Sequence, residues 1–142
     1  MQIKLGDINR LSVVKQVPFG YYLDGGRLHG EILLPQNEVL GNVAVGDDLD
    51  VFLYLDQEER LIATMRQPLA RVGDFAYLEV AWVNNFGAFL NWGLLKDLFV
   101  PFREQKMKMQ VVKKYVVYAY IDAVTYRILA SAKVEKFLSD EE

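Results

Sequence analysis

The chain has 142 residues, of which 52% are hydrophobic and 25% charged. This is the composition of a globular chain and excludes a disordered one. Because there is no cysteine, disulfides, thiol nucleophiles and thiolate metal sites are excluded. A net charge of -3 also argues against a strong nonspecific nucleic-acid binder, which normally carries a basic surplus.

Period-two alternation of apolar and polar residues, broken by Gly and Asx turns, predicts an all-β chain. In the first half we expect strands at Arg10–Val17, Gly20–Asp24, Glu31–Pro35, Asp50–Asp56 and Arg60–Arg66. In the second half we expect strands at Phe75–Asn84, Gly87–Trp92, Asp97–Pro101, Tyr115–Asp122 and Arg127–Lys133. The longer connections, 36–48 and 102–114, each have room for a helical turn, and 134–138 could begin a further element.

The second half of the chain repeats the first. Phe-Gly-Tyr-Tyr-Leu at 19–23 returns 67 residues later as Phe-Gly-Ala-Phe-Leu at 86–90, and Glu38 is matched by Glu104. The repetition predicts two small domains, 1–67 and 68–142, which meet at Gln67-Pro68 because proline cannot continue a central strand. Five short strands with one longer connection late in the order predict a Greek-key barrel in each domain.

Charge is unevenly shared between the halves. Residues 1–71 contain 7 Lys/Arg and 10 Asp/Glu, whereas residues 72–133 contain 8 Lys/Arg and 5 Asp/Glu. Four lysines gather in the second half: Lys106, Lys108, Lys113 and Lys114. A phosphate-facing surface is therefore expected in the second domain, although a lysine-rich loop can also be only a solvated surface.

The order of strands and motifs resembles the S1-type RNA-binding domain, an oligonucleotide-binding (OB) barrel. The resemblance consists of a long first strand, Phe-Gly-X-aromatic, a strand ending near a Glu, and a strand ending in Asp before an Arg-containing hairpin partner. It is sharper in the second half, in NNFGAFLNWG and KDLFVPFREQ. More narrowly, VGDFAYLEV, YVVYAYID and RILASAKVEKFL resemble the conserved virulence factor B family. Those bacterial proteins carry a third S1-like domain and a winged helix, and this chain looks like their N-terminal pair of domains.

The resemblance implies a set of aromatic residues that bind bases. The two aromatics of the repeated motif would stack on unpaired bases of single-stranded RNA: Phe86 and Phe89 in the second domain, Phe19 and Tyr22 in the first. The glycine between them would let the strand bend or let another backbone come close. The alternative is that one aromatic of each pair packs in the core.

A second pair of residues lies at the last hairpin of each domain. The resemblance places an Asp before the turn and an Arg after it, here Asp56 with Arg60 and Asp122 with Arg127. The arginine can pair with a phosphate or stack on a base while the Asp holds it, or the pair can be a turn-forming Asp beside a solvated Arg. Lys133 would extend the phosphate contacts if its strand faces outward.

The sequence offers little for catalysis. It has no Cys/His cluster, Gly-rich phosphate loop or HExxH motif, and the single histidine, His29, lies in a turn without a nucleophile beside it. We expect neither enzymatic activity nor a cofactor or metal. Since no signal peptide and no apolar run of roughly 20 residues is present, we also expect a cytoplasmic protein without a membrane contact.

Two functions remain open from the sequence. The first is an RNA-binding module that engages single-stranded RNA, which the resemblance connects with post-transcriptional regulation of gene expression. The second is a protein-interaction or assembly scaffold built from OB barrels. The second is favoured by the negative net charge and by Pro35 and Pro101, which stand where S1 domains often place a histidine.

Overall fold

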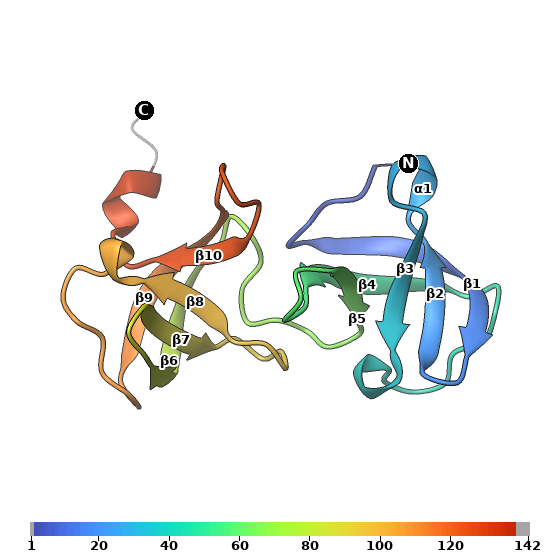
Figure 1. The fold of residues 1–142 in the computed structure, drawn as a ribbon, viewed down its shortest axis with the longest axis horizontal. Helices are drawn as coiled ribbons and strands as arrows, with labels where there is room; N and C mark the ends of the chain where they lie inside the picture. The colour runs from blue at the N-terminus through green and yellow to red at the C-terminus, as the bar shows by residue number, and fades with distance from the viewer. Residues whose placement is uncertain (1, 139–142) are drawn as a thin grey trace. The chain divides into compact units, whose positions relative to one another are not determined.

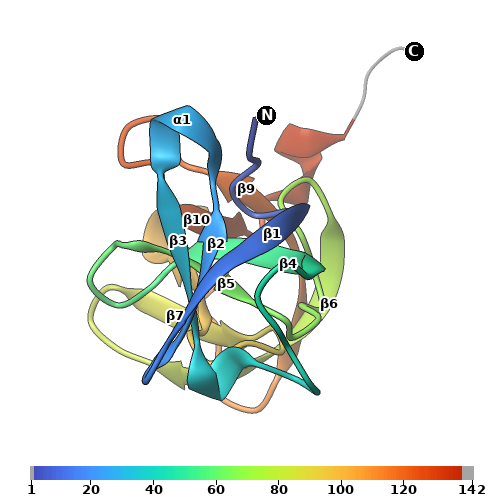
Figure 2. The same ribbon diagram turned by 90° about the vertical axis from the view of Figure 1, so that its right-hand side faces the viewer.

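Alternating strands of the first half close into a barrel. The computed structural model describes residues 2–138 (Figure 1). The elements of the first barrel are β1 (Ile8–Val17), β2 (Gly20–Asp24), α1 (Gly26–His29), β3 (Glu31–Pro35), the 3₁₀ turn η1 (Gln36–Glu38), β4 (Asp48–Leu55) and β5 (Leu61–Thr64). Around the barrel the order is β1-β2-β3-β5-β4, with β4 closing back on β1. The short α1 lies at the end of β2 and β3 in both views (Figure 2).

The second half builds the same barrel. Its elements are β6 (Phe75–Val83), β7 (Gly87–Asn91), β8 (Leu98–Pro101), the 3₁₀ turn η2 (Phe102–Glu104), β9 (Lys114–Ile121), β10 (Ile128–Ser131) and the 3₁₀ turn η3 (Val134–Phe137). The strand order β10-β8-β7-β6-β9 matches that of the first barrel, and β9 again pairs with both β6 and β10. The chain divides into two compact units between Gln67 and Pro68.

The inward residues of each barrel form its core. In the first barrel these are Leu11, Val13, Tyr21, Leu23, Ile32, Leu34, Val51, Leu53 and Ala63. In the second, the inward residues include Leu78, Val80, Ala88, Leu90, Leu98, Val100, Val117, Ala119, Leu129 and Ala130. Each barrel therefore buries its own apolar set, which is the main stabilising contribution available to units this small.

The fold expected from the sequence is confirmed: the chain is all-β apart from single helical turns, and residues 2–138 form two five-stranded barrels. Helical turns do occur in the two long connections, as η1 and η2, and η3 falls within 134–138. His29 was expected in a turn, but the structure places it at the end of the single-turn helix α1. Within residues 2–138, no helix has the length and apolar character needed to cross a membrane.

The glycine of the repeated motif allows two strands to approach closely. A Cβ on Gly87 would lie 2.3 Å from the carbonyl oxygen of Val100 and 2.9 Å from the Cα of Pro101. In the first barrel, a Cβ on Gly20 would meet the carbonyl oxygen of Leu34 at the same 2.3 Å. Close approach of a neighbouring backbone is thus the reason why both motifs carry glycine.

We expect Gly87→Ala to destabilise the second barrel by roughly 3 kcal/mol, because the nearest atom that its Cβ meets is a backbone carbonyl oxygen that cannot rotate away. Urea unfolding followed by tryptophan fluorescence would measure the loss, because both tryptophans, Trp82 and Trp92, lie in the second barrel. The matched control is Gly73→Ala, where φ is 96° but no atom lies within 4 Å. It should cost only about 1 kcal/mol. Equal losses for the two variants would contradict this explanation.

A buried carboxylate anchors the last strands of the first barrel. Glu38 in η1 is 2% exposed and accepts hydrogen bonds from Tyr54 Oη at 2.7 Å, Thr64 Oγ1 at 2.6 Å and Arg66 Nε at 3.1 Å. Burial, followed by the hydrogen bond to Glu38, raises the pKa of Tyr54, so its hydroxyl stays a donor. Together these bonds tie η1 to β4 and to the end of β5.

The second barrel has an equivalent carboxylate cluster around Glu104, in which Lys136 takes the place of Arg66. Glu104 in η2 accepts hydrogen bonds from Ser131 Oγ at 2.7 Å and from Lys136 Nζ at 2.8 Å. Burial alone would raise the pKa of Glu104, but the bonds from Lys136 and Ser131, with the charges of Lys136 and Arg103, lower it overall. The matched glutamates of the sequence repeat are therefore structural anchors of the two barrels.

The lowered pKa of Glu104 predicts a pH-dependent contribution to stability. In the folded state Glu104 binds its proton more weakly than in the unfolded chain. Its contribution to the free energy of unfolding is therefore fully present above the unfolded pKa of about 4.3, and it is lost as pH falls through the lower pKa of the folded state. The free energy of unfolding of wild type minus that of Glu104→Gln should thus be largest near neutral pH and shrink in acid. Urea unfolding across this pH range measures it, and a difference that grows in acid would contradict the prediction.

Candidate nucleic-acid interface

Three aromatic rings form a ladder across the outer surface of the second barrel. Strand register sets Trp82 of β6 opposite Phe89 of β7, and Phe89 opposite Phe99 of β8. The rings of Trp82 and Phe89 stack with centroids 3.9 Å apart and planes 4° from parallel, and those of Phe89 and Phe99 lie 4.8 Å apart at 33°. The result is a continuous aromatic strip over three neighbouring strands.

A β-bulge turns Trp82 outward. The β6–β7 register shifts between Val80 and Trp82, which leaves Ala81 as the extra residue. Because side chains alternate along a strand, Trp82 would otherwise share the inward face of Val80, which is fully buried. Instead Trp82 is 46% exposed, and its Nε1 donates to Asp97 Oδ2 at 3.0 Å, which fixes the plane of the ring.

The structure assigns different positions to the two predicted aromatics of this barrel. Phe86 is 72% exposed in the β6–β7 turn, where Asn84 Oδ1 accepts hydrogen bonds from the backbone N–H groups of Phe86 at 2.8 Å and Gly87 at 3.2 Å. Phe89 is half-buried between Trp82 and Phe99. The broad accessible rings at this surface therefore include Trp82 and Phe86, with Phe89 supporting Trp82 from beneath.

The first barrel has the same positions but not the same ladder. Lys15 stands where the second barrel has Trp82, also after a bulge, and its Nζ lies 5.0 Å from the centroid of Tyr22 and 3.1 Å from a carboxylate oxygen of Glu31. Leu33, paired with Tyr22, replaces the third ring. Phe19 is 56% exposed and meets Tyr22 edge-on, with centroids 6.3 Å apart. An ion pair thus occupies the site where the second barrel offers an indole.

The predicted Asp–Arg pair is present at the hairpin of the first barrel. Arg60 Nε donates to Asp56 Oδ2 at 3.0 Å, and Asp56 Oδ1 accepts the backbone N–H groups of Glu58 and Arg60 at 2.8 and 2.9 Å. Partial burial opposes ionisation, but these hydrogen bonds outweigh it and lower the pKa of Asp56. The carboxylate shapes the turn and also orients the guanidinium.

At the second hairpin, the carboxylate of Asp122 holds the turn through Thr125. Its Oδ2 accepts the backbone N–H and Oγ1 of Thr125 at 2.9 and 2.8 Å, and these bonds lower its pKa. The guanidinium of Arg103 lies 3.9 Å from Oδ1. Exposed Arg127 begins the approach to β10, which runs parallel to β8 with Leu129 paired to Phe99. Arg127 and Asp97, the partner of Trp82, therefore lie at the same end of their strands.

Lys133 lies at the far end of β10. It is half-buried, and its backbone N–H donates to Ser131 Oγ at 3.0 Å. Arg66, its counterpart in the first barrel, turns toward Glu38. A role in RNA contact for Lys133, as for the other predicted site residues, stays a prediction.

Residues 2–138 contain no group of three or more His, Cys, Asp or Glu side chains able to hold a metal ion. The absence of enzymatic activity also stays a prediction.

Sequence reasoning missed Trp82 and Phe99 as surface residues. The outward direction of Trp82 depends on a bulge that alternation alone does not reveal. A usable signal was present, since Lys15 occupies the equivalent position in the first half and a lysine there must face water.

Comparison with known proteins agrees with this architecture. Residues 5–66 match the S1 domain family. A stretch of 91 residues, 63% of this chain, is 38% identical to the uncharacterized protein YitL of Bacillus subtilis (strain 168) and covers 30% of that protein. The fold is similar, with a TM-score of 0.73 and 20% identity, to a multidomain protein with nucleic acid binding domains from Streptococcus pneumoniae. That match covers 89% of this chain and 45% of the other.

The chain is accordingly a tandem pair of five-stranded barrels of one topology. The family match falls in the first barrel, although the motif resemblance is sharper in the second. The second barrel repeats the strand order, the glycine contact and the buried glutamate of the first. In both comparisons this chain spans less than half the length of the protein that it matches.

Proposed function

We propose that this chain is a single-stranded RNA-binding module whose second barrel makes the principal contact. The observation that carries the proposal is the aromatic ladder of Trp82, Phe89 and Phe99, with Phe86 exposed beside it. Stacking on such rings suits unpaired bases of any sequence and contributes roughly 1 to 3 kcal/mol per base. Support also comes from the S1 domain match and from the nucleic acid binding domains named for the streptococcal protein.

The proposed contacts divide by chemistry. The outer face of Trp82 and the ring of Phe86 receive bases, while Phe89 backs the indole. Arg127, held near Asp97 by the β8–β10 pairing, meets a phosphate, and Lys133 contributes a more distant charge. Asp122 shapes the turn that presents Arg127.

In the first barrel we propose weaker contact. Phe19 offers an exposed ring and Arg60, held by Asp56, offers a guanidinium. Tyr22, however, lies beneath Lys15, which is already paired with Glu31. Residues 1–71 also carry a surplus of acidic side chains, which repels phosphate.

The cellular role follows only from resemblance. We propose that the chain corresponds to the N-terminal pair of domains of a protein of the conserved virulence factor B type. It would then act in the cytoplasm in post-transcriptional regulation, beside a third S1-like domain and a winged helix. The partial coverage of both relatives is consistent with further domains in the whole protein.

A protein-interaction scaffold is the second candidate function. It is favoured by exposed apolar residues on the outer face of β6 and β9, where Tyr77 is 64% and the opposed Val116 49% exposed. The net charge of -3 also favours a protein-interaction scaffold over a nucleic-acid binder. Apolar association should survive added salt, whereas RNA binding through phosphates should weaken.

Fluorescence anisotropy of a labelled single-stranded RNA of mixed sequence, titrated with the full chain at low and physiological salt, tests the proposal. We expect micromolar binding at low salt, and a log-log salt slope of about -0.7 for each phosphate contacted. Absence of binding at tens of micromolar, at both salt concentrations and with the protein folded, would sink the proposal.

A further inference from the structure

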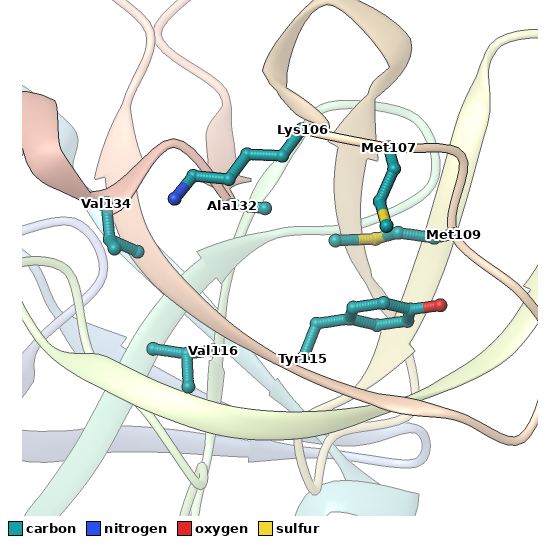
Figure 3. A pocket seen from close by; sticks show the side chains of 7 residues that line it. All are labelled: Lys106, Met107, Met109, Tyr115, Val116, Ala132 and Val134. Carbon is teal, nitrogen blue, oxygen red and sulfur yellow. The ribbon is translucent and has the colours of Figure 1, made fainter.

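A pocket of about 400 Å³ lies beside β9 in the second barrel, and none of its lining residues belongs to the aromatic ladder. Its lining comes from the connection after η2, the start of β9 and the segment after β10: Lys106, Met107, Met109, Tyr115, Val116, Ala132 and Val134 (Figure 3). In Figure 3, Met107 and Met109 lie over the ring of Tyr115, and Lys106 extends toward Val134. The walls are thus almost entirely apolar, with a single ammonium group at the rim.

The pocket lies beside Ala132, a small residue at a position where the first barrel has a larger one. Ala132 donates its backbone N–H to the carbonyl oxygen of Glu104 at 2.9 Å, just as Met65 donates to that of Glu38 at 3.1 Å in the first barrel. The two residues therefore hold equivalent positions. Met65 packs its side chain against the core, and its Sδ accepts the N–H of Leu40 at 3.4 Å. Where the first barrel has this thioether, the second has a methyl group beside an open space.

The charge around this position is also reversed between the barrels. Val80 exchanges backbone hydrogen bonds with Val112 and Lys113, as Val13 does with Gly46 and Asp47. This register equates Lys113 and Lys114 with Asp47 and Asp48. Lys108, exposed between the two lining methionines, adds a further positive charge. Lys108 and Lys114 are therefore direct chain neighbours of lining residues, and the first barrel has carboxylates at the positions of Lys113 and Lys114.

The polar groups at the pocket are already engaged. Tyr115 Oη accepts the backbone N–H of Gln110 at 2.9 Å, and Lys106 Nζ is ion-paired with Glu135. A nucleobase would bury donors and acceptors here without matched partners, which is costly. A Leu, Met or Phe side chain needs none, and methionines adapt readily to such groups. The Lys106–Glu135 pair shows that the rim accommodates a carboxylate.

We propose that this pocket is a docking site for an apolar side chain within an acidic peptide segment of a protein partner. The apolar side chain fills the space that Met65 fills in the first barrel. Carboxylates on either side of it meet Lys108, Lys113 and Lys114. The site is distinct from the aromatic ladder, so the chain can hold RNA and a protein segment at once.

A fluorescein-labelled peptide of Asp, Glu, Ser and Gly with one central Phe tests the proposal by anisotropy against the full chain. We expect a Kd of about 100 μM for wild type. Ala132→Met, which installs the residue of the first barrel, should weaken binding at least tenfold. Met107→Glu, at a position 71% exposed, should do the same through charge repulsion without threatening the fold. The mirror variant Met65→Ala should leave binding unchanged.

Three results would overturn the proposal. One is equal binding by wild type and the two pocket variants when circular dichroism shows all three folded. Another is equal binding of a peptide whose Phe is replaced by Ser, which would reduce the contact to charge alone. The last is a loss of single-stranded RNA affinity in Ala132→Met with no peptide binding by wild type, which would assign the pocket to a nucleobase.

Discussion

Trp82→Ala should lower the affinity for single-stranded RNA by tenfold or more. The substitution removes the outermost ring of the ladder, and loss of one stacked base costs roughly 1 to 3 kcal/mol. It also frees Asp97, now bonded to the indole at 3.0 Å, to present an unpaired carboxylate to the RNA backbone. Anisotropy titrations at fixed salt give the change in Kd.

The first barrel supplies the matched control. Lys15→Ala changes the equivalent position after the equivalent bulge, where the side chain is paired with Glu31. We expect a change in Kd below about threefold, since an exposed ion pair contributes little. Similar losses from the two substitutions would contradict the assignment of the main contact to the second barrel.

Glu38→Ala should destabilise the first barrel by about 3 to 5 kcal/mol, because it leaves the buried hydroxyls of Tyr54 and Thr64, and Nε of Arg66, without their acceptor. That is a large part of the stability of a unit this small. Urea unfolding followed by circular dichroism measures the loss.

An exposed glutamate of the same barrel serves as the reference. Glu58 has a side chain 73% exposed and lies 3.6 Å from Arg60, so Glu58→Ala should cost less than about 0.5 kcal/mol. If Glu38→Ala were as mild as Glu58→Ala, the buried carboxylate would not be an anchor. RNA affinity of the folded fraction should be nearly unchanged, because Glu38 is only 2% exposed.

Local sequence patterns were enough to predict the barrels. Strands of period two, glycine at a forced close approach and an internal repeat all act through short-range rules, and the structure bears out each of them. A surface position for Phe86 was expected only from the resemblance, and in the structure Phe86 is exposed in a turn beside Asn84. Asp56 and Arg60 met because a tight hairpin brings them together.

Features that depend on register or on distant partners escaped prediction. The bulge at Ala81 decides the face of Trp82, and sequence alternation alone does not locate it. Glu38 and Glu104 were visible as a repeated pair, but their partners lie 16 to 32 residues away and become neighbours only when the barrel closes. The 67-residue repeat already pairs Met65 with Ala132, but the difference gained meaning only once the structure showed a pocket beside Ala132.

The central claim is most directly tested by an NMR titration of the isotope-labelled full chain with unlabelled single-stranded RNA, observing the two indole N–H signals. Trp82 Nε1 lies at the exposed ladder, whereas Trp92 is 2% exposed and its Nε1 donates to the carbonyl oxygen of Lys96. We predict that the Trp82 signal and the backbone amides of β7 and β8 shift with RNA while the Trp92 signal stays in place. Shifts confined to the first barrel, or no shift at saturating RNA, would contradict the claim.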